Sequence, residues 1–360
     1  MKALKLNKTT RRNYLTYLLV ILAYVILQVL GSAGAISSSL KGMLVPICAY
    51  IVMAISLNLT VGVLGELSLG HAGFMSMGAF TGVTAAIALQ DAIPAAPLRM
   101  AIALLVGAAF AALSGFLIGI PVLRLNGDYL AIVTLAFGEI IKSIFNNLYV
   151  GVDSKGLHMS LLSDTTNLAE GGKLIIAGPM GIGGIQKIST FTAGFLLILL
   201  TLVVVFNLVN SRAGRAIMAI RDNRIAAESL GLNITKYKMM AFVTSAALAG
   251  MAGALFGLNY STVTASKFKF DTSILVLVFV VLGGIGNIRG SIIAATLLTV
   301  LPEMLRQFGD YRMLIYAIVL ILVMLATNNP TLRSAIDSLA ARIRKRGSSA
   351  PKTTKEGDKA

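Results

Sequence analysis

Residues 273–301 read SILVLVFVVLGGIGNIRGSIIAATLLTVL, and this stretch decides how the chain would cross a membrane. A helix needs about 20 apolar residues to cross the hydrocarbon core, and this stretch is longer. The glycine-rich run 283–290 interrupts it in the middle. Two apolar arms around such a turn can enter and leave the membrane on one face. We therefore expect a broken, re-entrant pair of short helices, since irregular backbone at membrane depth must be surrounded by protein or water.

The composition around this stretch is that of a membrane protein. Hydrophobic residues make up 56% of the 360 residues and charged residues only 13%, whereas soluble domains carry about 25% charge. Further apolar runs of spanning length predict an all-α, polytopic membrane protein. They cover residues 14–30, 43–61, 72–89, 98–120, 129–150, 191–209, 239–258 and 312–326.

The basic residues orient these spans. Of the 31 Lys and Arg residues, five lie in the first twelve residues, six lie between Arg212 and Lys238, and eight follow Asn329. Short basic segments beside membrane spans are retained on the cytoplasmic side. Simple crossings would leave the C-terminal cluster outside, whereas a re-entrant pair at 273–301 places both termini in the cytoplasm and gives about ten membrane helices. The charge is thus explained by topology and anionic membrane lipid, without a nucleic-acid partner.

This topology predicts three regions. Residues 1–13 form a basic cytoplasmic N-terminus, and the apolar run after them is expected to be an uncleaved signal anchor. Residues 14–328 form a single transmembrane domain, with an outer loop at 149–190 and a cytoplasmic loop at 211–238. Residues 329–360 form a basic cytoplasmic tail that is expected to be partly disordered.

The cytoplasmic loop contains the signals of a short helix. Asp222 or Asn223 can cap a helix that begins near Arg224, and Gly231 can end it at the position where glycine enters the left-handed region. Ala226, Ala227 and Leu230 would then form a small apolar patch on a helix parallel to the membrane. The alternative is a solvated basic loop that only fixes topology.

A second break occurs at residues 62–73, GVLGELSLGHAG. Paired glycine-interrupted spans indicate a transport pathway. A carboxylate such as Glu66 is costly at membrane depth unless it is paired or hydrated. His71 is either a pathway residue or a packed, hydrogen-bonded core residue. The single cysteine, Cys48, and two histidines offer no metal-ligand spacing, so we expect no metal, no cofactor and no catalytic residue.

Four motifs together resemble a known family. They are SLNLTVG at 56–62 running into GELSLGHA at 65–72, LRLNGDYLAIVTL at 123–135, the loop 211–238, and LGGIGNIRGS at 282–291. In this order they resemble the permeases of ATP-binding-cassette (ABC) importers, and in particular the M-type subunit of high-affinity branched-chain amino acid permeases. The resemblance covers most of the chain. One departure is Glu66, where the family more often has Gln.

The resemblance implies a fold, a set of partners and a location. The fold would be that of the vitamin B12 importer-type permeases. The chain would work with a second, homologous permease subunit, two cytosolic ATP-binding subunits and an extracytoplasmic substrate-binding protein. It would lie in the bacterial plasma (inner) membrane as a multi-pass protein that takes up branched-chain amino acids or related small solutes. The chain lacks the G-x-x-x-x-G-K-[ST] phosphate loop, so a partner would hydrolyse ATP.

The resemblance also implies two groups of site residues. Contact with the ATPase is expected from Arg221, Asp222, Ala226, Ala227, Glu228 and Gly231. The candidates for the translocation pathway are Glu66, Ser68, Gly70, His71, Gly283, Gly284 and Asn287.

Two rival functions predict different residues. An ion-coupled secondary transporter would also use broken helices, but it would need paired carboxylates within the membrane, where this chain offers Glu66 and Glu139. A membrane-embedded enzyme would need a nucleophile with its base, or a metal site, and the sequence contains no such arrangement.

Overall fold

The computed structural model describes residues 8–34, 37–125, 127–153, 156–161 and 173–328, so the expectations for residues 1–7 and 329–360 lie outside the described residues. The chain divides into two compact units, residues 1–303 and 304–360.

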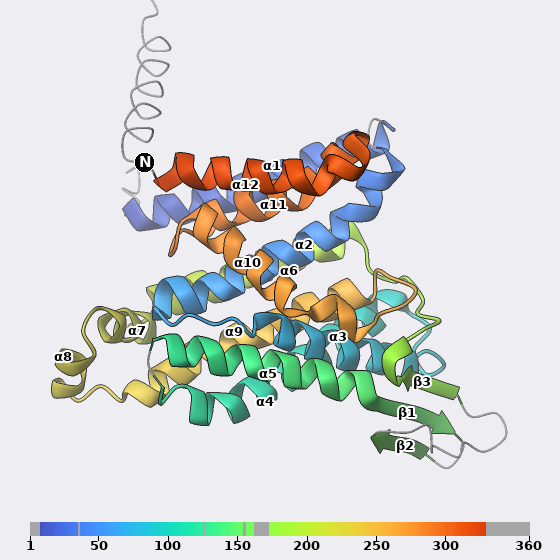
Figure 1. Ribbon diagram of the computed structural model, residues 1–360, viewed down its shortest axis with the longest axis horizontal. Coiled ribbons are helices and arrows are strands. Elements are labelled where there is room, and N and C mark those ends of the chain that lie inside the picture. The colour runs from blue at the N-terminus through green and yellow to red at the C-terminus, as the bar shows by residue number, and fades with distance from the viewer. Residues whose placement is uncertain (1–7, 35–36, 126, 154–155, 162–172, 329–360) are drawn as a thin grey trace, which may run out of the picture. The chain divides into compact units, whose positions relative to one another are not determined.

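The helices of the first unit form a bundle (Figure 1). Its elements are α1 (Lys8–Ser32), α2 (Ser38–Asn58), the π-helical η1 (Leu59–Leu64), α3 (His71–Ala88), α4 (Ala96–Val122), α5 (Asp128–Asn147), β1 (Leu148–Asp153), β2 (Gly156–Leu161), β3 (Lys173–Ala177), η2 (Gly178–Met180), α6 (Phe191–Asn210), α7 (Arg212–Asp222), α8 (Arg224–Ser229), α9 (Ile234–Gly257), η3 (Ala265–Phe268), α10 (Phe270–Gly283) and α11 (Ile288–Met304).

The described residues contain six helices long and apolar enough to cross a membrane. They are Asn13–Ser32, Ser38–Leu64, Ala96–Val122, Phe191–Asn210, Ile234–Gly257 and Ile288–Gly309. Two shorter apolar helices cover Phe270–Gly283 and Arg312–Leu322. The protein is therefore a multi-pass membrane protein.

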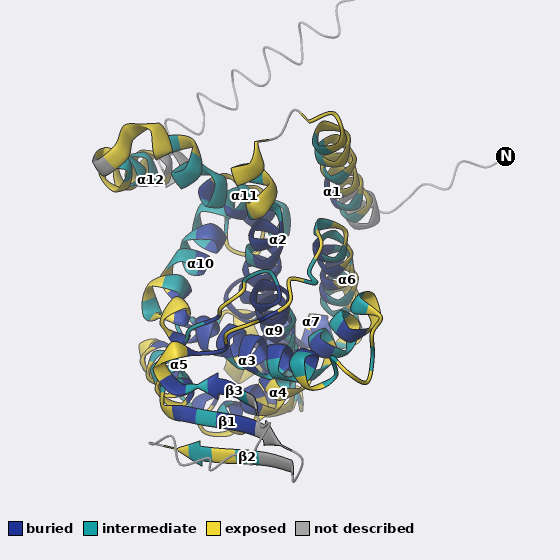
Figure 2. Ribbon diagram, turned by 90° about the vertical axis from the view of Figure 1, so that its right-hand side faces the viewer, coloured by how far each residue is buried: buried dark blue, intermediate teal, exposed yellow. Residues whose placement is uncertain are grey.

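Helices α3, α4 and α9 pack closely because small residues line their contacts. A Cβ atom on Gly78 would lie 2.0 Å from the carbonyl oxygen of Gly250, and one on Gly253 would lie 1.9 Å from that of Met75. Small residues allow helix backbones to approach in lipid, where apolar burial gives little drive for association. Figure 2 shows α9 and α2 as buried helices, and every residue of α2 from Val45 to Asn58 except Tyr50 is buried.

The stretch 273–301 is broken as expected. Helix α10 ends at Gly283, and α11 begins at Ile288. The turn between them lies at the same end of the bundle as α7 and α8 (Figure 1). The second break also appears, because α2 passes into η1 and the chain is then extended until α3 begins at His71.

The described chain is mostly helical, but the expectation of an all-α protein is wrong between residues 148 and 177. Three antiparallel strands form a sheet in the order β2-β1-β3, with Leu148 opposite Leu161 and Tyr149 opposite Ala177. Helix α5 passes directly into β1, so the end of the predicted apolar run 129–150 belongs to a strand. Only the last three residues of this run, Leu148 to Val150, belong to β1, and so few apolar residues do not distinguish a strand from the end of a helix.

Helix α1 contacts the bundle through few side chains. Among its described residues, only Thr16 and Val20 are buried. Tyr24 stacks on Phe191 and Phe195 of α6, with ring centroids 5.3 and 4.1 Å apart, and Tyr17 meets Phe206 edge to face. These ring contacts attach α1 mainly to α6.

The second unit, described by itself, contains the short helix η4 (Leu305–Tyr311) and α12 (Arg312–Asn328). Gly309, with a non-helical φ of 53°, forms a kink inside η4 between two short helical segments. Most of the described large apolar side chains of α12 are exposed, as expected for a helix that faces lipid.

Candidate functional site

The short helix expected near Arg224 is confirmed as α8. The side chain of Asn223 accepts a hydrogen bond from the backbone N–H of Ala226 at 3.0 Å, so Asn223 rather than Asp222 caps the helix. The backbone of Gly231 has φ of +79° and ends it. An N-cap oxygen satisfies one of the free N–H groups of the first turn, and glycine adopts the left-handed backbone without the strain of a Cβ atom.

The side chains of α8 do not form the expected apolar patch of Ala226, Ala227 and Leu230. Ala227 is buried in the chain's own small core with Ile220 and Ile234. The side chains that point outward are larger, since Ile225 is 79% exposed and Leu230 is 81% exposed. Single exposed apolar side chains are common on protein surfaces, so their exposure makes Ile225 and Leu230 candidates for a partner contact and does not define one. Ile225, which was not among the expected site residues, is thus exposed, whereas Ala227 is buried and cannot contact a partner directly.

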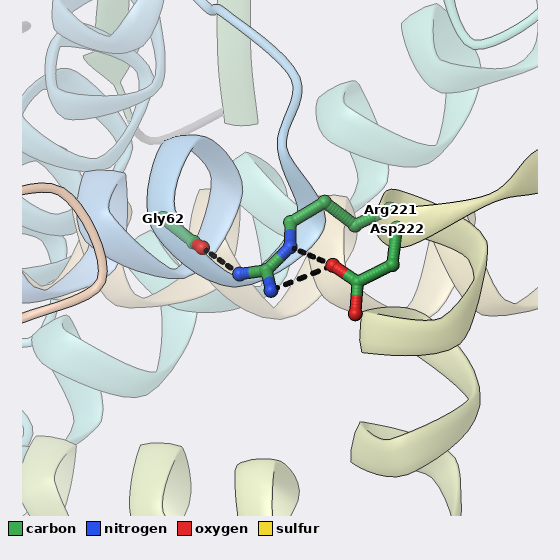
Figure 3. Close-up of polar contacts among 3 residues, drawn as sticks. All are labelled: Gly62, Arg221 and Asp222. Carbon is green, nitrogen blue, oxygen red and sulfur yellow. Dashed lines mark hydrogen bonds and ion pairs between the residues drawn. The ribbon is translucent and has the colours of Figure 1, made fainter.

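Arg221, at the end of α7, points into its own chain (Figure 3). Its NH1 group donates to the carbonyl oxygen of Gly62 in η1 at 2.9 Å. Its Nε and NH2 groups donate to Asp222 at 3.0 and 2.8 Å. Asp222 thus orients Arg221, and Arg221 holds the backbone of the first break at Gly62. This contact lies within the chain itself.

Lys238, at the start of α9, makes a second bond to the same segment. Its ammonium pairs with the carboxylate of Glu66, and the two side chains are only 5% and 12% exposed. A charge at membrane depth needs such a partner. Lys238 therefore provides the partner that a buried Glu66 carboxylate requires. Lys238 was not among the expected site residues.

Neighbouring helices hold the segment from η1 to the start of α3 at further points. The backbone N–H of Leu69 donates to Thr134 of α5 at 3.1 Å, and that of Ala72 donates to Ser273 of α10 at 3.0 Å. The His71 Nε2 atom lies 2.7 Å from the Ser56 hydroxyl, and His71 is buried. His71 thus has the hydrogen-bonded core environment that was one of its two interpretations.

The two glycine-rich breaks meet at Asn58. The Asn58 side chain accepts from the Gly286 N–H at 2.8 Å and donates to the Ser291 hydroxyl at 2.8 Å. A Cβ atom on Gly62 would lie 2.0 Å from Asn58 Oδ1 and 2.4 Å from the nitrogen of Gly286. One buried amide therefore joins the end of α2 to the α10–α11 turn, and only glycine fits between them.

The pathway candidates fall into two neighbouring groups, one at each break. Glu66, Ser68, Gly70 and His71 belong to the first break, where Ser68 is fully buried and its hydroxyl has no hydrogen-bond partner. Gly283 and Gly284 form the second break with Asn287. Asn287 lines a cavity of about 240 Å³ that none of the other candidates reach.

Comparison with known proteins agrees with the resemblance. The family described as "Branched-chain amino acid transport system / permease component" matches residues 39–324. The chain is 37% identical over 290 residues to the high-affinity branched-chain amino acid transport system permease protein LivM of Escherichia coli (strain K12), covering 77% of this chain and 66% of that protein. LivM of Salmonella typhimurium matches with the same identity and coverage. The chain thus spans slightly less than two thirds of the length of these curated relatives.

More distant relatives include other permeases. The fructose import permease protein FruG of Bifidobacterium longum is 26% identical over 249 residues, covering 65% of this chain and 67% of that protein. The high-affinity branched-chain amino acid transport system permease protein LivH of Salmonella typhimurium is 32% identical over 117 residues, covering 32% of this chain and 38% of that protein. No solved structure matches the chain.

Proposed function

Because the chain belongs to the family of branched-chain amino acid transport permease components, we propose that it is the transmembrane permease subunit of an ABC importer. The observation that carries the mechanism is that both flanks of α8 bond to the same membrane segment, Arg221 to Gly62 and Lys238 to Glu66. A cytosolic ATPase that displaces α8 would pull on both bonds. ATP hydrolysis belongs to that partner, and this subunit is not an enzyme.

The proposed orientation places the α7–α8 end in the cytoplasm of the bacterial inner membrane and the sheet outside. Six Lys and Arg residues between Arg212 and Lys238 support this orientation. Ten membrane helices then bring both termini to the cytoplasm. They are α1 to α6, α9, α10, α11 and α12, with α10 and α11 as the re-entrant pair, as in the vitamin B12 importer-type fold.

The proposed substrate is a branched-chain amino acid, on the evidence of the LivM relatives. Similarity to LivH supports a homologous permease partner in a heterodimer. Two ATP-binding subunits and an extracytoplasmic binding protein complete the proposed importer. The pathway would open beside the first break, where movement would expose Ser68.

A secondary transporter is the alternative, and the carboxylates weigh against it. Glu66 pairs with Lys238, and Glu139 pairs with Lys142 on the same helix. A carboxylate that already has a lysine partner does not need a transported cation to balance its charge. The described residues also contain no group of three His, Cys, Asp or Glu side chains that could hold a metal ion.

Replacing both outward apolar side chains of α8, Ile225→Asp with Leu230→Asp, is expected to weaken ATPase binding by about tenfold or more. The reason is that truncation or charging of buried interface anchors costs about 2 kcal/mol or more. Co-purification of the assembled importer and titration with the ATPase subunits would measure the loss.

The matched control is Met159→Asp with Leu161→Asp, two exposed apolar residues on β2, outside the membrane spans; ATPase binding by this variant should stay normal if the protein folds. A second pair, Glu228→Ala with Gly231→Val, should reduce ATP-driven uptake in vesicles. Normal uptake and normal ATPase association in both α8 pairs would refute the assignment of α8.

A further inference from the structure

Helix α5 carries an ion pair on a side that the chain itself leaves partly open. Glu139 pairs with Lys142, one turn further along the helix, and their side chains are 38% and 27% exposed. The small residues Ala136 and Ser143, three before and four after Glu139, are exposed as well. Residues three and four apart are neighbours on a helix surface. These four residues, which we call the α5 patch, thus combine two opposite charges with little side-chain bulk beside them.

The α5 patch lies in the outer half of the membrane in the span assignment proposed above. Helix α5 ends at Asn147 and passes into β1, on the proposed outer side (Figure 1). At 1.5 Å per residue, Glu139 lies about 12 Å from that end. Its side chain leans toward the helix N-terminus and thus away from the outer surface. A carboxylate at this depth is costly in lipid hydrocarbon, so water or protein is expected to cover the α5 patch.

The helix that carries the α5 patch packs against the first break. A Cβ atom on Gly73 of α3 would lie only 2.9 Å from the Cα atom of Gly138, the residue before Glu139. The backbone N–H of Leu69 donates to the Thr134 hydroxyl, earlier on α5, at 3.1 Å. The proposed pathway opens beside this same segment, so a solute in that pathway passes close to the α5 patch.

We propose that the α5 patch binds the transported amino acid, with the substrate ammonium at Glu139 and the substrate carboxylate at Lys142. This site rests on the proposed function, because it requires an amino acid as the substrate. A zwitterionic amino acid carries both charges on neighbouring groups and leaves the site electrically neutral. A ligand with only one charge would leave one member of the pair without a partner, which is costly away from bulk water.

The ion pair of the α5 patch is suited to exchange its partners for a substrate. An ammonium has three N–H donors and a carboxylate accepts through two oxygens, so both groups keep bonding capacity while they pair with each other. A partly exposed pair at this helical spacing contributes little stability. The substrate therefore replaces a weak bond within the helix by two charge-assisted bonds to itself.

Cysteine labelling tests whether water and substrate reach the α5 patch. The single native cysteine, Cys48, is only 2% exposed, so its background signal is small. The complete importer with Ser143→Cys is placed in proteoliposomes and treated with a membrane-impermeant methanethiosulfonate. We expect labelling of Ser143→Cys. The matched control, Leu113→Cys, replaces an exposed apolar residue of α4 that is expected to face lipid, and it should resist labelling.

Protection by ligands tests the zwitterion directly. Leucine should slow the labelling of Ser143→Cys at about tenfold lower concentration than isocaproate, which lacks the ammonium, or isopentylamine, which lacks the carboxylate. The reason is that each analogue loses one charge-assisted hydrogen bond.

The double variant Glu139→Gln with Lys142→Met separates substrate binding from a structural role. It leaves no charge unpaired, and replacing both members of a structural ion pair is often neutral for stability. We expect this variant to assemble with its partners and to unfold at a near-normal temperature. Leucine should no longer protect Ser143→Cys in this background, and leucine uptake should fall about tenfold or more.

Leucine uptake by the unchanged importer tests the proposed function separately. If that uptake is present, three results would overturn the site at the α5 patch alone. They are absence of labelling at Ser143→Cys, equal protection by leucine and the two analogues, and normal leucine uptake by the double variant. If the unchanged importer takes up no branched-chain amino acid, the proposed function fails and this site fails with it.

Discussion

Replacing Gly62 by alanine is expected to disable transport and to lower the thermal stability of the protein. The added methyl group would lie 2.0 Å from Asn58 Oδ1 and 2.4 Å from the nitrogen of Gly286. The Asn58 amide and the α10–α11 turn would have to separate, which breaks the hydrogen bond between them. Forcing an extra methyl group into a packed site costs about 1–3 kcal/mol. Uptake in proteoliposomes and the thermal unfolding temperature in detergent would both report the change.

Gly42→Ala is the matched control, because Gly42 lies in the same membrane span, Ser38–Leu64, with nothing within 4 Å of the new Cβ atom. It should leave uptake normal and raise stability slightly, since glycine in a helix costs about 1 kcal/mol relative to alanine. If Gly62→Ala behaved like Gly42→Ala in both measurements, the close contact between the two breaks would be refuted.

The second large effect is expected at Lys238→Met. The substitution leaves the Glu66 carboxylate, with a side chain only 12% exposed, without its ammonium partner. Removing one member of a buried ion pair destabilises a protein by about 3–5 kcal/mol, because the remaining charge is buried and unpaired. We expect a large fall in the unfolding temperature and little protein in the membrane.

The double variant Glu66→Gln with Lys238→Met removes both charges and should recover most of the lost stability. Interacting residues give non-additive effects in a double-mutant cycle. A matched control is Lys142→Met, whose partner Glu139 has a side chain 38% exposed to its surroundings; its effect should be smaller. A double variant as unstable as the sum of its two single variants would contradict the ion pair.

Local sequence signals predicted the elements of this site well. The glycine-rich runs after Gly62 and Gly283 indicated both breaks, and the Asn223 and Gly231 caps indicated α8. These features depend on backbone preferences of a few consecutive residues, which a sequence displays directly. The family resemblance then supplied the expected role of the loop, and the comparisons confirmed the family.

Contacts between distant residues were not predictable in the same way. Arg221 and Gly62 are 159 residues apart, and Asn58 and Gly286 are 228 apart. No periodic pattern specifies which polar groups meet across a bundle, although the cost of an unpaired Glu66 required some partner. The exposed Ile225 was missed because burial of Ala227 depends on where Ile220 and Ile234 lie. The sheet of β1, β2 and β3 was missed because β1 continues directly from α5, and its pairing with β2 and β3 is a contact between separate segments.

These long-range bonds lead to the central claim about mechanism. Helix α8 has exposed side chains. On either side of it, Arg221 bonds to Gly62 and Lys238 pairs with Glu66, and both of these partners belong to the first break. That segment contacts the second break through Asn58. A displacement of α8 therefore has a direct physical route to both interruptions of the membrane helices. In this account Arg221 transmits motion and is not itself an anchor for the ATPase.

The most direct test is the number of substrate molecules taken up per ATP hydrolysed, measured in proteoliposomes that contain the complete importer with Arg221→Met. The account predicts that the ATPase subunits still bind and hydrolyse ATP at near-normal rates. Uptake per ATP should fall about fivefold or more, the usual size of a coupling free energy. An unchanged ratio, or loss of ATPase binding together with uptake, would contradict the account.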